Sequence, residues 1–307
     1  MTSAPKPTPW QVGLILTVGI VSVSTAAVFI RLALAAADVR GVGFSLVLAA
    51  LRLTIAALLL IPAWRNFRNQ TFQRSALFYA LAAGVCLALH FATWITSLSF
   101  TSIAASTTLV TTNPIWVALL SWLWFKEKPT ALTIAGIGIT LTGGILIGLA
   151  STGTATDGSN PMLGNGLALV GSWAVSLYFL LGREAQQRGL GIGSHVVLTY
   201  STAALVLLPL PLLFGSSYEG YSAEVYLYIF LMALFPQVIG HTSFNWAVRW
   251  VSPTLVTLVI LAEPVGSGIL GFLVFRENPG VIVLIGAVII LTGVAIAVIG
   301  ARKPAEV

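Results

Sequence analysis

The second half of this chain repeats the first half at a fixed offset of 150 positions. Residues 102–142 align with 252–292 without a gap. The identical pairs include Ser102 and Ser252, Thr107 and Thr257, Pro114 and Pro264, Phe125 and Phe275, Glu127 and Glu277, and Gly136 and Gly286. Both copies are rich in apolar residues, and a duplicated set of membrane helices is typical of secondary transporters.

The composition indicates that lipid is the solvent for most of the chain. Apolar residues make up 57% of the sequence and charged residues 8%, and the mean hydropathy is +0.97. Soluble domains carry about 25% charged residues. The net charge of +6 does not indicate nucleic-acid binding, because the basic residues lie singly or in short groups between apolar runs. That distribution is typical of membrane orientation signals.

Ten apolar runs are long enough to span a bilayer, which needs about 20 residues for each helix. They are Trp10–Ala37, Gly43–Trp64, Ala76–Leu98, Ile103–Trp124, Ala131–Ala150, Gly164–Leu181, Val196–Phe214, Val225–Ala247, Leu255–Phe275 and Val281–Ala301. The first run is longer than the apolar core of a signal peptide, so we expect it to be a retained helix. The chain is predicted to be an all-α integral membrane protein.

The distribution of Lys and Arg among the loops predicts the orientation. One side holds Lys6, Arg65, Arg68, Arg74, Lys126, Lys128, Arg183, Arg188, Arg249, Arg302 and Lys303, and the other holds Arg40 and Arg276, with Arg31 near a helix end. Both termini are therefore expected to be cytoplasmic. Each half has an odd number of spans, so the second half must enter the membrane from the opposite side. We predict a 5+5 inverted repeat, with repeats at 1–150 and 164–307 joined by a linker at 151–163.

The eighth and third spans, which are repeat mates, carry polar or aromatic side chains at a spacing of four. Gln237, His241 and Asn245 share one face of the eighth span, and His90 and Trp94 share one face of the third. A polar face is costly in lipid, so it must face a cavity or another helix. Substrate-cavity lining is the favoured interpretation, and hydrogen bonding between helices is the alternative.

Glu263 is a charged residue near the middle of the ninth span, directly before Pro264. Proline lacks an N–H, so a helix is expected to kink there. The glutamate could carry a proton, accept a substrate ammonium, or donate a hydrogen bond near the kink. Its repeat mate is Asn113 before Pro114, a second expected kink. Arg52 is a buried charge in the second span. Pairing with a carboxylate within the bundle is the favoured interpretation, and the alternatives are snorkelling and binding of an anionic group of the substrate.

Further candidates for the cavity are Thr111 and Asn113 on the fourth span and Trp173 on the sixth. His241 joins Glu263 as a candidate for proton coupling. Gly144 and Gly148 form a G-x-x-x-G pattern, which predicts close helix packing on the fifth span. No metal site or cofactor is expected, because no third histidine or carboxylate stands at ligand spacing and Cys86 is the single cysteine.

The sequence contains no phosphate-binding loop of the type G-x-x-x-x-G-K-[ST], no H-E-x-x-H and no G-x-S-x-G motif. ATP hydrolysis by that loop is therefore not expected, and nothing in the sequence favours an enzyme.

The segments 90–129 and 240–279 resemble the two signature segments of the EamA-like drug/metabolite transporter superfamily. The family pattern has small and hydroxyl residues, a mid-helix proline and a closing glutamate. Here these are Pro114 with Glu127 and Pro264 with Glu277. The resemblance covers nearly the whole chain as two EamA-type units. It implies a ten-helix transporter with a central cavity, and structural roles for the two closing glutamates.

These observations predict a secondary active transporter of a bacterial inner membrane that exports small metabolites such as amino acids by alternating access. Its partners would be a small-molecule substrate, the lipid bilayer and protons as a coupling ion. The alternatives are a non-transporting receptor or scaffold, and an uptake carrier for another small metabolite.

Overall fold

The computed structural model describes residues 6–39, 41–97, 99–100, 106, 109–150, 160–276 and 280–301, and every regular element in these residues is a helix. The first half contains α1 (Pro9–Ser24), α2 (Ala26–Ala37), α3 (Val42–Leu59), the 3-10 helix η1 (Ile61–Asn69), α4 (Arg74–Ser97), α6 (Asn113–Phe125) and α7 (Ala131–Ala150). The second half contains α8 (Pro161–Gln187), α9 (Ile192–Leu207), α10 (Leu210–Leu213), α11 (Ala223–Met232), the π-helix η3 (Ala233–His241), α12 (Thr242–Ala247), α13 (Pro253–Ile260), α14 (Glu263–Phe275) and α15 (Gly280–Ala301).

Eight helical stretches of the described residues are long and apolar enough to cross a membrane. Two further apolar helices, Asn113–Phe125 and Ala131–Leu146, are shorter than these eight stretches. The expected all-helical membrane architecture is therefore confirmed for the described chain. The count of ten spans remains a prediction, because the fourth run includes residues 103–105 and 107–108, which lie outside the described residues.

Several runs that read as single helices are interrupted near their middle. The first run breaks at Thr25, between α1 and α2. The ninth breaks at Leu261–Ala262, after which Glu263 begins α14, and the fourth breaks at the matching Thr111–Thr112, after which Asn113 begins α6. Pro114 is therefore in the first turn of α6; the backbone of Pro264 takes the same place in α14, and its side chain lies outside the described residues.

The eighth run contains a nine-residue π-helix, η3, with Pro236 inside it. Proline cannot donate the backbone hydrogen bond that an α-helix requires, and π-helical turns are frequent near functional sites. A π-helix has more residues per turn than an α-helix, so it changes the angular positions of the residues after it relative to those before it. The three residues of the expected stripe have different surroundings: Gln237 contacts Arg52, His241 lines a pocket and Asn245 contacts Tyr178.

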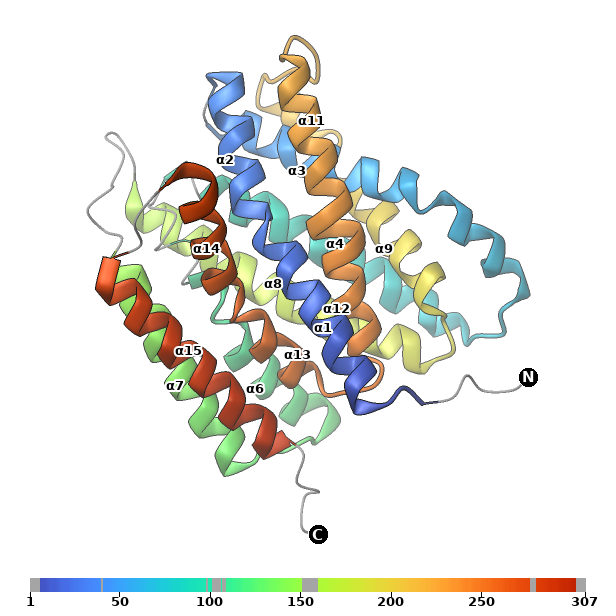
Figure 1. Ribbon diagram of the computed structural model, residues 1–307. Coiled ribbons are helices and arrows are strands. Elements are labelled where there is room, and N and C mark those ends of the chain that lie inside the picture. Colours follow the sequence, from blue (N-terminus) through green and yellow to red (C-terminus); the bar gives the residue numbers. More distant parts are fainter. Residues whose placement is uncertain are drawn as a thin grey trace.

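The two halves are packed into each other throughout the bundle (Figure 1). The first run contacts the eighth, since α1 packs on η3 and α12 and α2 packs on α11. Other contacts across the halves include those of α4 with α8, α3 with α9, α6 with α13, and α7 with α15. The main hydrophobic core therefore contains buried residues of both halves.

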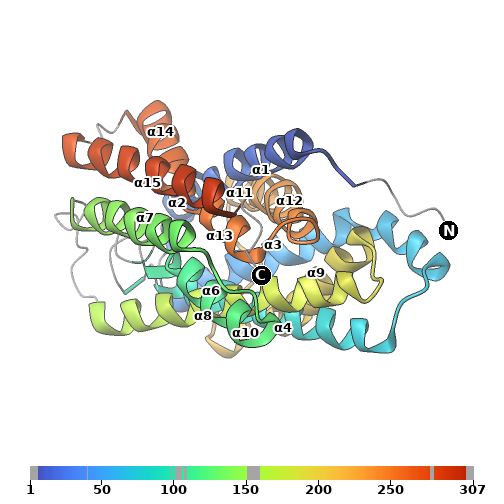
Figure 2. The same cartoon turned by 90° about the horizontal axis from the view of Figure 1, so that it is seen from below.

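Helices α7 and α15 lie side by side in both views and run in opposite directions (Figures 1 and 2). Their backbones meet at glycines, because a Cβ on Gly136 would lie 2.7 Å from the Gly293 carbonyl oxygen, and one on Gly143 would lie 2.7 Å from the Gly286 carbonyl oxygen. The prediction of close packing at Gly144 is wrong, because the space beside it is open; the surroundings of Gly148 lie outside the described part. Small residues permit such close approach in lipid.

Candidate functional site

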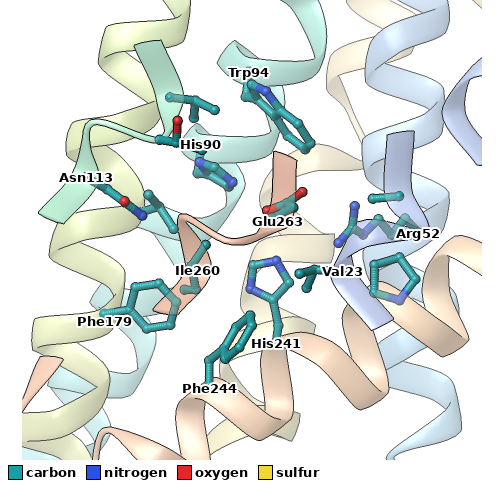
Figure 3. A pocket seen from close by; sticks show the side chains of 15 residues that line it. Val23, Arg52, His90, Trp94, Asn113, Phe179, His241, Phe244, Ile260 and Glu263 are labelled. Atoms are coloured by element: carbon teal, nitrogen blue, oxygen red, sulfur yellow. The ribbon is translucent and has the colours of Figure 1, made fainter. Parts of the chain in front are cut away.

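A pocket lies between the two halves at the level of the helix breaks (Figure 3). The cavity volume is about 50 Å³. This is room for a few water molecules, since one water needs roughly 10–15 Å³. The lining residues are Val23, Ala26, Arg52, His90, Trp94, Val110, Thr111, Asn113, Val175, Phe179, Pro236, His241, Phe244, Ile260 and Glu263.

The breaks in the fourth and ninth runs bring two polar residues to the pocket. Asn113 and Glu263 each begin a 13-residue helix, α6 and α14 respectively. Both line the pocket, and they are repeat mates at the offset of 150. Interrupted helices of this kind form the binding sites of many secondary transporters, because helix termini carry unpaired backbone groups and a partial charge.

His90 and Trp94 come from one face of α4, as the spacing of four predicts. Their rings are stacked, with centroids 5.7 Å apart and planes 13° apart. His90 is fixed by a 2.9 Å hydrogen bond between Nδ1 and the Gly171 carbonyl oxygen. The Trp94 Nε1 is buried and has no hydrogen-bond partner among the described residues, so one donor at the pocket is not satisfied.

His241 ends the π-helix and lies in the pocket wall opposite Trp94 (Figure 3). Its ring packs edge-on against Phe91 at 5.5 Å and Phe244 at 6.3 Å. The buried Nδ1 atom makes no hydrogen bond to any described residue. His90 and His241 therefore reach the same pocket from different halves of the chain.

Arg52 is the buried cation of the pocket, with 1% of its surface exposed. Its Nε donates a 3.0 Å hydrogen bond to Oε1 of Gln237, and its guanidinium lies 4.3 Å from the centre of the Phe91 ring. Arg52 is held within the bundle by this amide, and it forms no ion pair with a carboxylate of the described residues. Gln237 does not line the pocket and instead holds Arg52 in place.

Glu263 brings a carboxylate to the pocket from the second half (Figure 3). Its side chain makes no hydrogen bond and no ion pair within 4.0 Å to any residue that the structure describes, although it interacts electrostatically with Arg52. In particular, no hydrogen bond connects the carboxyl group to the helix break at Leu261–Ala262. The free carboxylate is therefore directed to the pocket rather than to the backbone.

The other predicted residues have distinct surroundings. Thr111 lines the pocket. Trp173 does not; it packs edge-on against Trp116 at 5.4 Å and is 47% exposed. Asn245 is fully buried beside the pocket wall, where its Nδ2 donates to the Tyr178 hydroxyl and, over 2.7 Å, to the His241 carbonyl oxygen.

Sequence reasoning missed His195 and Tyr200, two buried residues of α9. His195 Nε2 lies 3.2 Å from Oδ1 of Asn245, and the Tyr200 hydroxyl donates a 3.3 Å hydrogen bond to the Gln237 carbonyl oxygen. Both residues support the segment that carries His241. Their position in an apolar run was a possible signal, since polar groups in a membrane helix require a partner.

No group of three or more His, Cys, Asp or Glu side chains that could hold a metal ion is present in the described chain. The polar side-chain groups that line the pocket are one guanidinium, one carboxylate, two imidazoles, an amide, a hydroxyl and an indole. These groups can recognise a small polar molecule by charge and hydrogen bonding.

A helical bundle with long apolar spans and a central polar pocket between its halves defines a multi-pass membrane protein of the transporter class. Comparison with known proteins agrees. The chain belongs to the EamA-like transporter family, whose sequence profile matches it twice, over residues 10–149 and 162–299. The duplication seen in the sequence is therefore confirmed as two EamA-type repeats.

Relatives are named as transporters without a stated substrate. An uncharacterized transporter of Synechocystis is 26% identical over 241 residues, which cover 76% of this chain and 70% of that protein. An uncharacterized transporter of Archaeoglobus fulgidus is 24% identical over 218 residues, covering 68% and 72%. A crystal structure with 18% identity aligns over 96% of this chain and 99% of its own with a TM-score of 0.77, so the fold is shared.

Proposed function

We propose that this protein is a secondary active transporter that moves small metabolites, such as amino acids, by alternating access around the central pocket. It has ten spans in a 5+5 inverted repeat, with repeats at 1–150 and 164–307. The observation that carries the proposal is the pocket itself, which both halves line with buried polar side chains at matching helix breaks.

The direction of transport is export from a bacterial inner (plasma) membrane, with both termini cytoplasmic. The distribution of Lys and Arg supports the cytoplasmic position of both termini, since cytoplasmic loops are enriched in these residues. Protons are the coupling ion, and Glu263 and His241 are the titratable residues of the second half that line the pocket.

The present pocket is too small for a metabolite, because ligand sites typically enclose about 300–1,000 Å³. The volume of about 50 Å³ fits a closed conformation between the two open ones. Rocking of one half against the other would widen the pocket toward each side in turn. His90, Trp94, Thr111, Asn113, His241 and Glu263 then contact the substrate, whereas Gln237 and Asn245 position Arg52 and His241.

Flux measurements in liposomes test the proposal. The purified protein is reconstituted, and uptake or release of a panel of radiolabelled amino acids is followed. We expect saturable flux, and we expect Trp94→Phe and His241→Ala to lower it about tenfold or more while the protein stays folded. Trp173→Phe is the matched control, because it removes the same N–H outside the pocket.

Two outcomes would contradict the proposal. Absence of flux and of saturable binding for every compound would favour a receptor or scaffold. Normal flux by both pocket variants would show that the Trp94 and His241 side chains are not part of the transport site.

A further inference from the structure

Two opposite charges face the same pocket from different halves of the chain. Arg52 comes from α3 and Glu263 from the start of α14, and both side chains are turned toward the pocket (Figure 3). Isolated charges within the membrane region are costly and are usually paired with each other. These two interact electrostatically but are not joined by an ion pair within 4.0 Å in the described chain. The pocket therefore holds a cation and an anion that are not in direct contact.

Arg52 is held so that one edge of its guanidinium is available. Gln237 binds Nε and the Phe91 ring covers one face, while the buried Nη1 atom has no hydrogen-bond partner among the described residues. A guanidinium with a fixed plane and a free N–H edge fits a carboxylate, which can accept such N–H groups in its own plane. The free edge is therefore suited to a carboxylate of a ligand.

Glu263 is suited to the opposite group. Its carboxylate has no hydrogen bond to any described residue, and it lies in the pocket wall with acceptors available. An ammonium group offers three N–H donors and one positive charge. Asn113 also lines the pocket, and its Oδ1 atom, which has no hydrogen-bond partner among the described residues, is a further acceptor for such a donor.

The remaining wall is apolar and aromatic. Phe179, Phe244 and Ile260 line the side of the pocket near His241, and the stacked His90 and Trp94 rings lie across from them. A ligand side chain placed between these groups would be removed from water, which is favourable only if it has apolar surface. The pocket thus combines two charged ends with one apolar wall.

From this geometry we infer that the transported molecule is a zwitterion, whose carboxylate binds Arg52 and whose ammonium binds Glu263. The inference rests on the proposed transport function and names the substrate class for that site. A zwitterion compensates both buried charges at once. A simple acid or a simple amine would leave one of them without a partner in a site of low dielectric, and unpaired buried charges are strongly unfavourable.

Matched sets of three probes test the inference on the full-length protein in detergent. Each set shares one carbon skeleton: alanine, ethylamine and propanoate; leucine, 3-methylbutylamine and 4-methylpentanoate; phenylalanine, 2-phenylethylamine and 3-phenylpropanoate. Binding is followed by calorimetry and by thermal stabilisation, because a ligand of the folded state raises its stability. In at least one set, we expect the zwitterion to bind about tenfold or more tightly than its acid and its amine.

Two substitutions give a readout that lost stability alone would not produce. Glu263→Gln should reduce the preference for the zwitterion over the acid to about one, while the acid still binds. Arg52→Gln should reduce the preference for the zwitterion over the amine in the same way. If Arg52→Gln does not fold, Gln237→Ala replaces it, because Gln237 fixes the Arg52 side chain.

The controls remove the same charges elsewhere. Glu224 lies in the first turn of α11, and Arg249 stacks on Trp250 outside the pocket. We expect both control variants, Glu224→Gln and Arg249→Gln, to keep the preference of the unmodified protein. A change equal to that of the pocket variants would point to a general effect of net charge.

The inference is overturned if an acid or an amine binds as tightly as the zwitterion in all three sets, if no zwitterion binds, or if Glu263→Gln leaves the preference unchanged. Failure of this inference can be distinguished from failure of the transport function. Flux of an acid or an amine in liposomes would support transport and contradict the zwitterion as substrate. Binding of a zwitterion without any flux would support the zwitterion as ligand and contradict transport.

Discussion

Arg183 of α8 donates a 2.6 Å hydrogen bond from Nη2 to Oε1 of Glu127, and this ion pair joins the second half of the chain to the first. The guanidinium also lies 4.8 Å from the centre of the Phe125 ring. A related contact occurs between Arg31 of α2 and the Phe275 ring at 4.4 Å. Phe125 and Phe275 are repeat mates that end α6 and α14, so the two arginine–aromatic contacts occupy equivalent places in the two halves.

Alternating access would require these contacts to open in turn. With side-chain exposures of 14% and 39%, the Arg183–Glu127 pair is partly buried. Its loss should cost about 1 kcal/mol and shift a conformational equilibrium about fivefold. We therefore expect Arg183→Gln to raise the maleimide labelling rate of a Val175→Cys reporter in the pocket about fivefold, in a Cys86→Ser background.

Two comparisons make this prediction specific. Exchanging the charges, with Arg183→Glu and Glu127→Arg together, should restore part of the original labelling rate. Arg249→Gln should leave it unchanged. A labelling rate that does not respond to Arg183→Gln would show that the ion pair is not part of the closed contact.

The packing of α7 on α15 predicts a sharp difference between two glycines of one helix. A Cβ at Gly136 would lie 2.6 Å from the Ala297 Cβ and 2.7 Å from the Gly293 carbonyl oxygen, whereas no atom lies within 4 Å of a Cβ at Gly138. Gly136→Ala should therefore destabilise the protein by about 1–3 kcal/mol through overpacking. Gly138→Ala should be neutral or stabilising, because alanine favours a helix over glycine. Thermal unfolding in detergent checks both, and equal effects would contradict the packing described.

The sequence predicted the helical architecture and much of the pocket wall, because both depend on local patterns. Runs of apolar residues locate helices, and buried polar residues in them require partners. The repeat added long-range information, since its offset of 150 positions pairs Asn113 with Glu263. These two residues do reach the same pocket.

The parts that could not be predicted depend on departures from ideal helices. The spacing of Gln237, His241 and Asn245 indicated one face, but in the π-helix around Pro236 the Gln237 side chain bonds to Arg52, whereas His241 lines the pocket. Asn245 instead contacts α8 and α9, through Tyr178 and His195. The position of Trp173 could not be predicted for a different reason, because no local pattern in the sequence indicates which face of α8 lines the pocket.

The contacts of Asn245 predict a structural effect for its substitution. Its side chain bonds to Tyr178, His195 and the His241 carbonyl oxygen, and it is fully buried. Asn245→Ala leaves these partners without their bonds, and we expect a loss of about 1–3 kcal/mol of stability. Thermal unfolding should show this loss, whereas Asn160→Ala, at the exposed start of α8, should cost about 1 kcal/mol or less. A variant as stable as the parent would contradict the bonding described.

The proposed inverted repeat makes a prediction about the linker between the halves. With both termini cytoplasmic and five spans in each half, residues 151–163 lie on the periplasmic side. A reporter that is active only in the cytoplasm should therefore stay silent when fused after Gly158. The same reporter fused after Arg188, on the side that holds most Lys and Arg residues, should be active. Activity at Gly158 would refute the inverted arrangement.

The last prediction separates two roles of Glu263 in transport. The carboxylate faces a pocket that also contains Arg52, His90 and His241, and it makes no hydrogen bond to the helix break beside it in the described chain. Glu263→Gln keeps size and hydrogen bonding but removes titration. If Glu263 carries the coupling proton, the variant should lose flux driven by a pH gradient and retain exchange of substrate across liposomes at saturating concentration. His241→Ala and His90→Ala, measured in the same way, show whether another titratable group of the pocket shares the role. Unchanged gradient-driven flux in Glu263→Gln would exclude proton coupling through this residue, and loss of both activities would assign it to substrate binding alone.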